Sequence, residues 1–316
     1  MSAPGVSVIL PTDSWATILP VCGSLAALEC RSMLEVVIVA PSSALDGIDR
    51  TVLHQFREHR LVSMDPIIPL GDARAAGVRV ATGSIVFIGE THSFPAAGMF
   101  KALVDAHARG ATMAVPAFEN SNPDGAVSWA GFITGYASWT SGSARVISSA
   151  PTFNVSYRRE FLIALGGQLE RAMTEGEDMI GVLHEGGHEI WFAPDARIGH
   201  ANISSALPWL HQRYLAGRVI AANRSRSWSV ARRMFYAAAS PFIPAVLLWR
   251  HKAGIRRTAG AAKRRGTLPM LVIGLVAQAA GELAGHLAGS DAATRDRYDD
   301  YEIRRLMFVR DGDRVS

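Results

Sequence analysis

Glu90 and His92 are the first residues whose types and spacing point to chemistry. Only Thr91 separates them, and they come just after the apolar run at residues 84–88. On an extended chain, side chains two residues apart point to the same side, so this carboxylate and imidazole could share one ion. A mixed oxygen and nitrogen pair suits Mn²⁺ better than Mg²⁺, which prefers oxygen ligands. The alternative interpretation is a polar strand end that binds no metal.

A second acidic pair, Glu177 and Asp178, stands at the predicted start of a helix. The stretch Thr174–Glu177 has the form of a capping box, and two glycines at 186 and 187 end the helix before a predicted strand at residues 189–193. Acidic side chains in a first helical turn bind free backbone amides and suit the helix dipole. We assign this capping role mainly to Glu177, although a carboxylate placed there could also accept a proton in catalysis.

The segments around these residues alternate between short apolar runs and helical patterns. Strands are predicted at residues 6–10, 34–40, 84–88 and 113–116, and helices at residues 15–30, 45–59, 72–82 and 96–109. Continuous runs rich in Val and Ile indicate buried parallel strands, and their alternation with helices predicts an α/β fold. Residues 119–152 are rich in Ser, Gly, Asn and aromatic residues, which predicts loops.

Basic residues concentrate in one part of the chain. Of the 32 Lys and Arg residues in this 316-residue protein, thirteen lie between Arg213 and Arg265, a stretch without Asp or Glu. The other nineteen stand against 28 acidic residues, so the formal net charge of +4 has a local origin. A local excess of this kind is typical of proteins that contact an anionic membrane surface.

Two apolar segments lie in or near this basic stretch. Residues 234–249 are too few for a membrane span of roughly twenty residues and contain two prolines. Residues 268–289 are long enough, but Glu282 and His286 would be costly facing lipid. Basic residues on both sides of the first segment favour a re-entrant or interfacial position with both flanks in the cytosol. The alternative is a pair of buried helices in a soluble bundle.

Cysteine usage and the N-terminal residues indicate a cytosolic protein. Cys22 and Cys30 do not have a metal-ligand or redox spacing, so we expect reduced core thiols. The first five residues carry no charged leader and run straight into a strand, so no secretory signal is expected.

Several motifs between residues 5 and 201, in this order, resemble those of family 2 glycosyltransferases. They are V-S-V-I-L-P-T at 6–12, A-R-A-A-G at 73–77, E-T-H at 90–92, N-V-S-Y-R-R at 154–159, G-E-D at 176–178, G-G-H at 186–188 and P-D-A at 194–196. Two positions depart from the family pattern. Glu90-Thr91-His92 replaces the family's metal-binding Asp-x-Asp, and Ala40 replaces a common base-contacting Asp, which leaves base recognition to Ser42 or to backbone groups.

The resemblance implies a fold and a set of functional residues. The fold is the glycosyltransferase A fold, a Rossmann-like α/β sheet that binds a nucleotide-diphospho-sugar. Asp178 would be the catalytic base, with Glu177 beside it, and Glu90 and His92 would hold a divalent metal ion near the diphosphate. The implied donor-binding residues are Pro11, Thr12, Ser42, Arg74 and Gly77.

We therefore expect a glycosyltransferase catalytic domain at residues 1–205, a basic and hydrophobic membrane-associated helical region at 206–290, and a polar tail at 291–316. The expected activity is inverting sugar transfer to a lipid-linked sugar or a cell-envelope glycan precursor, at the cytoplasmic face of a bacterial cell membrane and without a nucleic-acid partner. The two departures also allow a catalytically weakened membrane scaffold. A nucleotidyltransferase would need a Gly- and Lys/Arg-rich loop after the first strand, which residues 12–15 do not provide.

Overall fold

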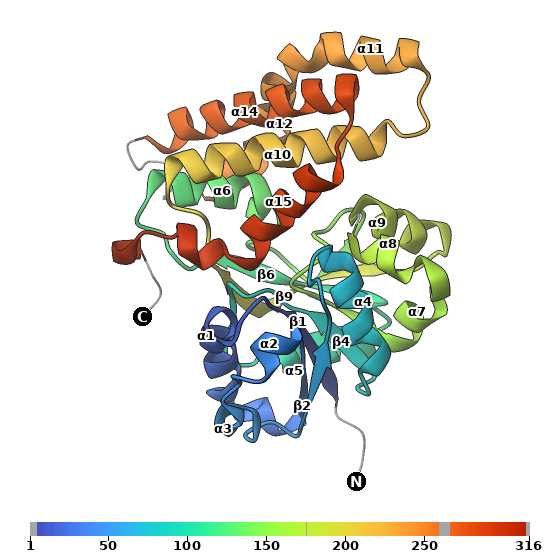
Figure 1. The fold of residues 1–316 in the computed structure, drawn as a ribbon, viewed down its shortest axis with the longest axis vertical. Coiled ribbons are helices and arrows are strands. Elements are labelled where there is room, and N and C mark those ends of the chain that lie inside the picture. Colours follow the sequence, from blue (N-terminus) through green and yellow to red (C-terminus); the bar gives the residue numbers. More distant parts are fainter. Residues whose placement is uncertain (1–4, 175, 259–265, 314–316) are drawn as a thin grey trace. The chain divides into compact units, whose positions relative to one another are not determined.

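A computed structural model describes residues 5–174, 176–258 and 266–313 (Figure 1). The chain divides into two compact units. The first contains the residues up to Glu119 together with Trp139–His200, and the second contains Asn120–Ser138 together with the residues from Ala201 on. A short internal segment therefore leaves the first unit and joins the second.

The first unit is built on a sheet that has nine strands within the described residues. Along the sheet the order is β3-β2-β1-β4-β8-β6-β9-β5, and β7 also pairs with β9. The strands are β1 (Val6–Pro11), β2 (Leu34–Ala40), β3 (Glu58–Ser63), β4 (Ile85–Ile88), β5 (Ser93–Pro95), β6 (Met113–Asn120), β7 (Arg145–Ile147), β8 (Val155–Arg158) and β9 (Ile190–His200). The strands from β3 to β4 are parallel, whereas β8 is antiparallel to both β4 and β6.

The predicted strands at residues 6–10, 34–40, 84–88 and 113–116 are confirmed as β1, β2, β4 and β6, and β6 continues to Asn120. Every residue of β1, β2 and β4 is buried. Parallel strands covered on both faces are rich in apolar side chains, which explains their Val and Ile runs. The buried Glu35 of β2 is an exception, and it accepts hydrogen bonds from Ser7 and Arg60. The predicted strand at residues 189–193 is β9, which extends to His200.

The helices of the first unit include short and long segments. They are α1 (Trp15–Ala26), α2 (Ser42–Leu45), α3 (Arg50–Leu53), α4 (Leu70–Val80), α5 (Met99–Ala108), α7 (Arg159–Ala164), α8 (Leu169–Thr174) and α9 (Gly176–Glu185). Helix α4 packs on β1 and β2 and also against α8, while α5 packs against β9. The helices predicted at residues 15–30, 72–82 and 96–109 correspond to α1, α4 and α5, although α1 ends at Ala26.

Two secondary-structure predictions are wrong. The helix predicted at residues 45–59 is replaced by the short helices α2 and α3 and by the start of β3, an edge strand whose side chains are half-buried or exposed and therefore show no apolar run. Residues 119–152, predicted as loops, contain α6 (Ala126–Gly135) and β7. Helix α6 is stable despite its glycines because its apolar side chains are buried in the second unit.

The two cysteines have different surroundings. Cys22 is fully buried in α1, and its burial raises the pKa of the thiol to about 12. Cys30 is only half-buried, and both thiols are free. The prediction of reduced core thiols is therefore confirmed for Cys22, while Cys30 lies at the edge of the core.

The second unit consists of helices around its own apolar core. They are α6, α10 (Ala206–Arg224), α11 (Val230–Ala239), α12 (Ile243–Arg257), α14 (Thr267–Ala288) and α15 (Ala292–Ile303). Ile133, Trp209, Leu271 and Leu275 lie in this core, so α6, α10 and α14 share it.

Helices α10 and α14 pack closely, backbone against backbone. A Cβ atom added at Gly281 would overlap the carbonyl oxygen of Tyr214, and one added at Gly217 would overlap the carbonyl oxygen of Gln278. Neither obstacle is a flexible side chain, so these two positions require glycine for the observed packing. The small residues thus fix the distance between the two longest helices of this unit.

The two apolar segments adopt different structures. Residues 234–249 are divided among α11, a 3₁₀ turn at Ser240–Phe242 and α12, with Pro241 inside the turn. Within the described residues, α14 is the one helix long and apolar enough to cross a membrane, and 44% of that apolar window is buried. Leu268, Val272 and Val276 are exposed on α14, whereas Leu271 and Leu275 face the core. Burial of this extent is also found in core helices of soluble proteins, so length and composition give weak evidence for a span.

Candidate metal and donor site

Strand pairing brings together three potential metal ligands that are far apart in the sequence. Glu90 and His92 lie in the turn between β4 and β5, and His200 is the last residue of β9. Strands β5 and β9 are antiparallel, and Ser93 is opposite His200 in their register. The imidazole of His200 therefore lies next to that of His92, although 108 residues separate them in the chain.

The three side chains converge on one point. Glu90 Oε2 lies 3.1 Å from His92 Nε2 and 3.6 Å from His200 Nε2, and the two Nε2 atoms are 3.1 Å apart. The Glu90 side chain is 8% exposed, and the two histidines are fully buried. Their rings meet edge to face at 85°, with both Nε2 atoms near the carboxylate. One carboxylate oxygen and two imidazole nitrogens are thus presented at the same place.

Asn154 supports this cluster from the neighbouring strand. It precedes β8, which pairs with β4, and its backbone amide donates to the carbonyl of Ile88 at 2.7 Å. Its side-chain Nδ2 donates to Glu90 Oε2 at 2.5 Å, and its φ of 58° is a left-handed conformation that Asn tolerates better than most residues. Within the described residues, its buried Oδ1 atom has no hydrogen-bond partner. That orphaned acceptor leaves room for a further ligand interaction beside Glu90.

The electrostatics of the cluster suit a divalent cation. Burial alone would raise the pKa of Glu90, but the imidazoles of His92 and His200 lower it well below its ordinary value. Two Nε2 atoms at 3.1 Å need a hydrogen between them, and a metal ion would take the place of that proton. Two imidazole nitrogens and one carboxylate oxygen are a donor set that fits Mn²⁺ better than Mg²⁺. The residues present therefore fit a divalent metal ion.

The structure corrects how Glu90 and His92 come together. On the extended segment expected from the sequence, the two side chains would point the same way, but residues 91 and 92 form a turn. The two side chains still converge, because the turn directs both toward the end of β9. Sequence reasoning missed His200 and Asn154, since their place in the cluster depends on the pairing of β9 with β5 and of β8 with β4.

Most of the residues predicted to bind the donor have structural partners. Thr12, directly after Pro11 at the end of β1, donates its amide to Val39 O at 2.9 Å and its hydroxyl to Ser14 O at 2.9 Å. Gly77 lets α4 approach β1 and β2, because an added Cβ would overlap the side chain of Ile9.

Arg74 is held in a fixed position inside the first unit. It is 5% exposed, its guanidinium carbon lies 3.5 Å from the centre of the Phe153 ring, and one nitrogen donates to Met173 O at 3.2 Å. This cation–π contact and hydrogen bond join α4 to α8 and to the segment that precedes β8.

Ser42 has a partner that the sequence analysis did not identify. Its amide and hydroxyl donate to Asp65 Oδ2 at 3.0 and 2.8 Å, and these hydrogen bonds lower the pKa of Asp65. Asp65 is exposed just after β3, next to the end of β2. A carboxylate therefore stands at the carboxyl ends of these parallel strands, although Ala40 does not supply one.

Asp178 lies in the first turn of α9, as predicted, with a side chain that is 31% exposed. Its Oδ2 accepts a hydrogen bond from Arg171 Nε of α8 at 2.5 Å, so this partner belongs to α8 and not to the metal cluster. The side chain of Glu177 lies outside the described residues, and with it the proposed capping box. Thr174 ends α8, where its hydroxyl donates to Glu170 O at 2.8 Å.

Comparison with known proteins finds similarity in structure only. No family model matches the sequence, and no curated protein matches it. The mannosyltransferase PcManGT from Pyrobaculum calidifontis, solved with GDP-Man and Mn²⁺, has 18% identity and a TM-score of 0.50 over 96% of this chain and 88% of that one. TarS 1–349 from S. aureus, solved with UDP, has 16% identity and a TM-score of 0.47 over 94% and 90%.

GalNAc-T7, solved with UDP, GalNAc and Mn²⁺, has 15% identity and a TM-score of 0.47 over 62% of this chain. The chain spans 43% of the length of GalNAc-T7, less than half. The likeness to PcManGT carries the fold assignment, and at 18% identity it shows the fold alone. The protein has the glycosyltransferase A fold.

Proposed function

We propose that this chain is an inverting glycosyltransferase that moves a sugar from a nucleotide-diphosphate donor to an acceptor held at a membrane surface. The observation that carries the proposal is the buried Glu90, His92 and His200 cluster, in a fold shared with a mannosyltransferase that was solved with GDP-Man and Mn²⁺. The cluster follows β4, one of the parallel strands, and ligands of open α/β sheets bind beyond the carboxyl ends of such strands.

A divalent ion held by Glu90, His92 and His200 would neutralise the charge on the departing diphosphate. The Ser42 and Asp65 pair, at the ends of β2 and β3, offers a hydroxyl and a carboxylate for the polar edge of the nucleoside. Asp178 takes the proton from the acceptor hydroxyl as its oxygen bonds to the anomeric carbon, while the bond from that carbon to the diphosphate breaks. Arg171 pairs with the carboxylate of Asp178 and holds it at the start of α9.

The test combines binding and turnover. Calorimetric titration with Mn²⁺ followed by UDP and GDP sugars should show donor binding that depends on the metal. His200→Ala should weaken the binding of Mn²⁺ and, as a result, the binding of the donor. Asp178→Asn should bind donor normally and lose transfer, whereas Asp105→Asn, an exposed change on α5, should retain both. The absence of binding for every donor would support the scaffold alternative, and normal transfer by Asp178→Asn would exclude that residue as the base.

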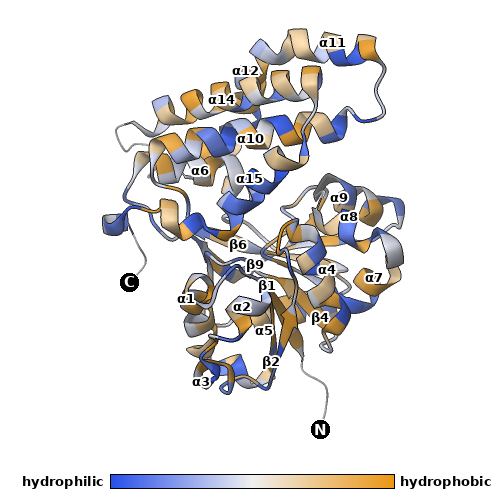
Figure 2. Cartoon of the chain, in the orientation of Figure 1, coloured by the Kyte–Doolittle hydropathy of each residue, from blue (hydrophilic) through white to orange (hydrophobic). Residues whose placement is uncertain are grey.

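The membrane part of the proposal rests on exposed side chains of the second unit. Val230, Phe235, Phe242 and Trp249 are each at least 65% exposed on α11, the Ser240–Phe242 turn and α12. The same helices carry basic residues, and Figure 2 shows hydrophilic and hydrophobic residues alternating on α11. Exposed aromatic and aliphatic side chains with interspersed Arg and Lys are typical of helices that lie in a membrane interface.

Two cation–π contacts fit this position. Lys252 Nζ lies 4.6 Å from the centre of the Trp249 ring, and the guanidinium carbon of Arg232 lies 4.1 Å from the centre of the Trp228 ring.

We infer that this surface of the second unit docks on the anionic cytoplasmic leaflet. Sedimentation with anionic vesicles should recover the wild-type protein, and Phe235→Asp with Phe242→Asp should weaken binding tenfold or more, since burying each ring is worth about 2 kcal/mol. Val146→Asp, at an exposed position of β7, is the control; equal loss there, or no loss in the double variant, would contradict the docking surface.

A further inference from the structure

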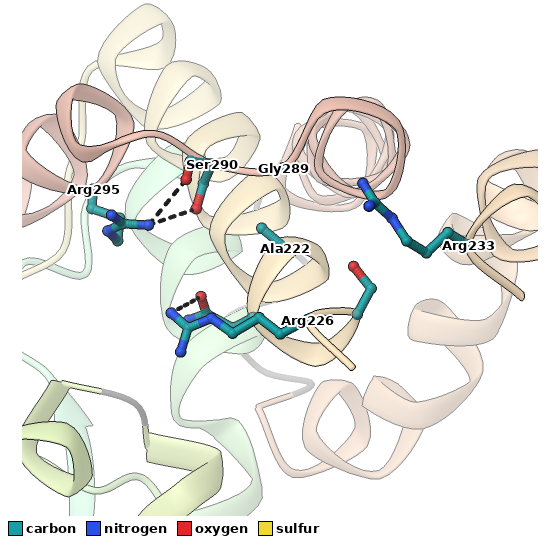
Figure 3. Close-up of a pocket in the computed structure, with 8 residues that line it drawn as sticks. Ala222, Arg226, Arg233, Gly289, Ser290 and Arg295 are labelled. Carbon is teal, nitrogen blue, oxygen red and sulfur yellow. Dashed lines mark hydrogen bonds between the residues drawn. The ribbon is translucent and has the colours of Figure 1, made fainter. Parts of the chain in front are cut away.

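Two of the arginines around the cavity in Figure 3 serve the end of a helix. Arg233 donates to the carbonyls of His286 and Leu287, in the last turn of α14, at 2.9 and 3.4 Å. Arg295 donates to the carbonyl and hydroxyl of Ser290, just past that helix, at 3.0 and 3.3 Å. The last carbonyls of a helix have no partner within the helix, so capping by side chains accounts for these two arginines.

Asn154, in contrast, has a polar side chain that packing alone does not explain. The residue is fully buried, and its Nδ2 donates to Glu90 Oε2 at 2.5 Å. Its Oδ1 has no hydrogen-bond partner among the described residues. Burying an amide with an unpaired oxygen costs free energy that an apolar side chain of similar size would not cost. The side chain is therefore retained for what it does to the carboxylate that it contacts.

The backbone of Asn154 restricts which residue can stand there. Its φ of 58° is in the left-handed region, and its amide donates to Ile88 O at 2.7 Å at the point where β8 begins to pair with β4. Asn, Asp and Gly adopt this conformation more readily than other residues. Of these three, only Asn has a side-chain N–H that can donate to a carboxylate. The position thus combines a conformational requirement with the need for a donor.

The hydrogen bond from Asn154 reaches the oxygen on which the cluster converges. Glu90 Oε2 lies 3.1 Å from His92 Nε2 and 3.6 Å from His200 Nε2. A carboxylate oxygen has two lone pairs, so Oε2 can accept from Asn154 and still bind an ion. The last torsion of a glutamate side chain is broad, so a carboxylate without a second partner rotates. The bond to Asn154 removes that freedom.

We propose that Asn154 is a positioning residue that fixes the carboxylate of Glu90 for the binding of a divalent metal ion. Because the carboxylate is oriented before the ion arrives, less conformational entropy is lost when the ion binds. Residues that orient metal ligands in this way contribute roughly ten- to hundredfold to metal affinity. The proposal rests on the metal site of the proposed function, and it assigns Asn154 no contact with the ion itself.

The test measures the Mn²⁺ affinity of the full chain without donor, from the electron paramagnetic resonance signal of the free ion. Asn154→Gly keeps the left-handed backbone and removes the amide side chain, so it should weaken Mn²⁺ binding by about tenfold or more. Ser156→Ala is the control, because it removes a buried hydroxyl of the same strand that bonds to His107 at 2.8 Å. It should change Mn²⁺ affinity by less than about twofold.

A second variant covers the case in which Asn154→Gly does not fold. The hydroxyl of Asn154→Ser ends one atom short of the position of Nδ2, so this variant also lacks the bond to Glu90 and should show the same loss of affinity. Circular dichroism of the metal-free variants identifies those that are folded.

A double-variant comparison separates positioning from a general structural role. Glu90→Gln removes the carboxylate on which Asn154 acts, so adding Asn154→Gly to it should weaken Mn²⁺ binding by less than about twofold further, whereas independent effects would multiply. The proposal is overturned if the folded Asn154 variants bind Mn²⁺ like the wild type, if Ser156→Ala loses as much affinity, or if the losses multiply. A wild-type protein that binds no Mn²⁺ would overturn the metal site of the proposed function as well, whereas wild-type affinity in Asn154→Gly would overturn this inference alone.

Discussion

Acid should destabilise the first unit through one buried histidine, His107. Its side chain is 4% exposed on α5, its Nδ1 donates to Ala111 O at 2.8 Å, and its Nε2 accepts from the Ser156 hydroxyl at 2.8 Å. Burial lowers the pKa of His107 to about 4, and the charge of Arg158 also lowers it, while the bond to Ala111 acts in the opposite direction. Ser156 belongs to β8, the strand that follows Asn154. His107 therefore supports the strand beside the cluster of Glu90, His92 and His200.

The size of the effect follows from the two pKa values. Above pH 6.5 the imidazole is neutral in both the folded and the unfolded chain, and its contribution to stability is complete. As the pH falls toward 4, the unfolded chain binds a proton that folded His107 does not, so the free energy of unfolding decreases. The loss from this one residue is about 2 kcal/mol at pH 5 and approaches about 3 kcal/mol near pH 4.

Urea unfolding at pH 7.5 and at pH 5.0, followed by circular dichroism, measures this dependence. His107→Gln lacks the titrating group, so its loss of stability between the two pH values should be smaller than that of the wild type by about 2 kcal/mol. This difference holds even if the variant is less stable at both pH values. His184→Gln, at an exposed position of α9, should keep the wild-type dependence. An unchanged dependence in His107→Gln would show that the reasoning from burial is wrong.

Three further predictions concern packing, thiol reactivity and donor binding. Gly281→Ala should lower the free energy of unfolding by about 1–3 kcal/mol, because its methyl group would overlap the carbonyl oxygen of Tyr214; a melting temperature equal to the wild type would contradict this packing. Cys22, whose thiol pKa is raised to about 12 by burial, should resist iodoacetamide in the native protein and react in urea, as measured by mass spectrometry; rapid native labelling would argue against its burial. Asp65→Asn should weaken nucleotide-sugar binding about tenfold while leaving Mn²⁺ affinity unchanged in calorimetry, and unchanged donor affinity would remove Asp65 from the donor site.

The sequence predicts the centre of the sheet better than its edge. The bounds of β2 match those predicted from the run of Val and Ile, because a parallel strand covered on both faces is mostly apolar. Strand β3, Glu58–Ser63, lies at the edge of the sheet. Its polar and apolar residues do not alternate clearly, so its own sequence does not distinguish it from a helix. Its hydrogen bonds to β2, a tertiary effect, decide its structure.

The candidate site is only partly visible in the sequence for a similar reason. Glu90 and His92 are neighbours in the chain, and their types and spacing were enough to select them. His200 and Asn154 join them only through strand pairs that connect distant segments, and no local pattern marks either residue as a ligand. Asp65 likewise gains its importance from Ser42, 23 residues away.

Helix α6 limits how a fragment that contains only the first unit can be prepared from this protein. Cutting the chain after His200 would keep residues 120–138 but remove Trp209, Leu271 and Leu275, which bury the apolar side of α6. Such a fragment would expose Val127, Ala130 and Ile133 and would be prone to aggregate. The helical region therefore completes the folding of an internal segment of the chain, and a soluble version would have to replace α6 with a polar connection between Glu119 and Trp139.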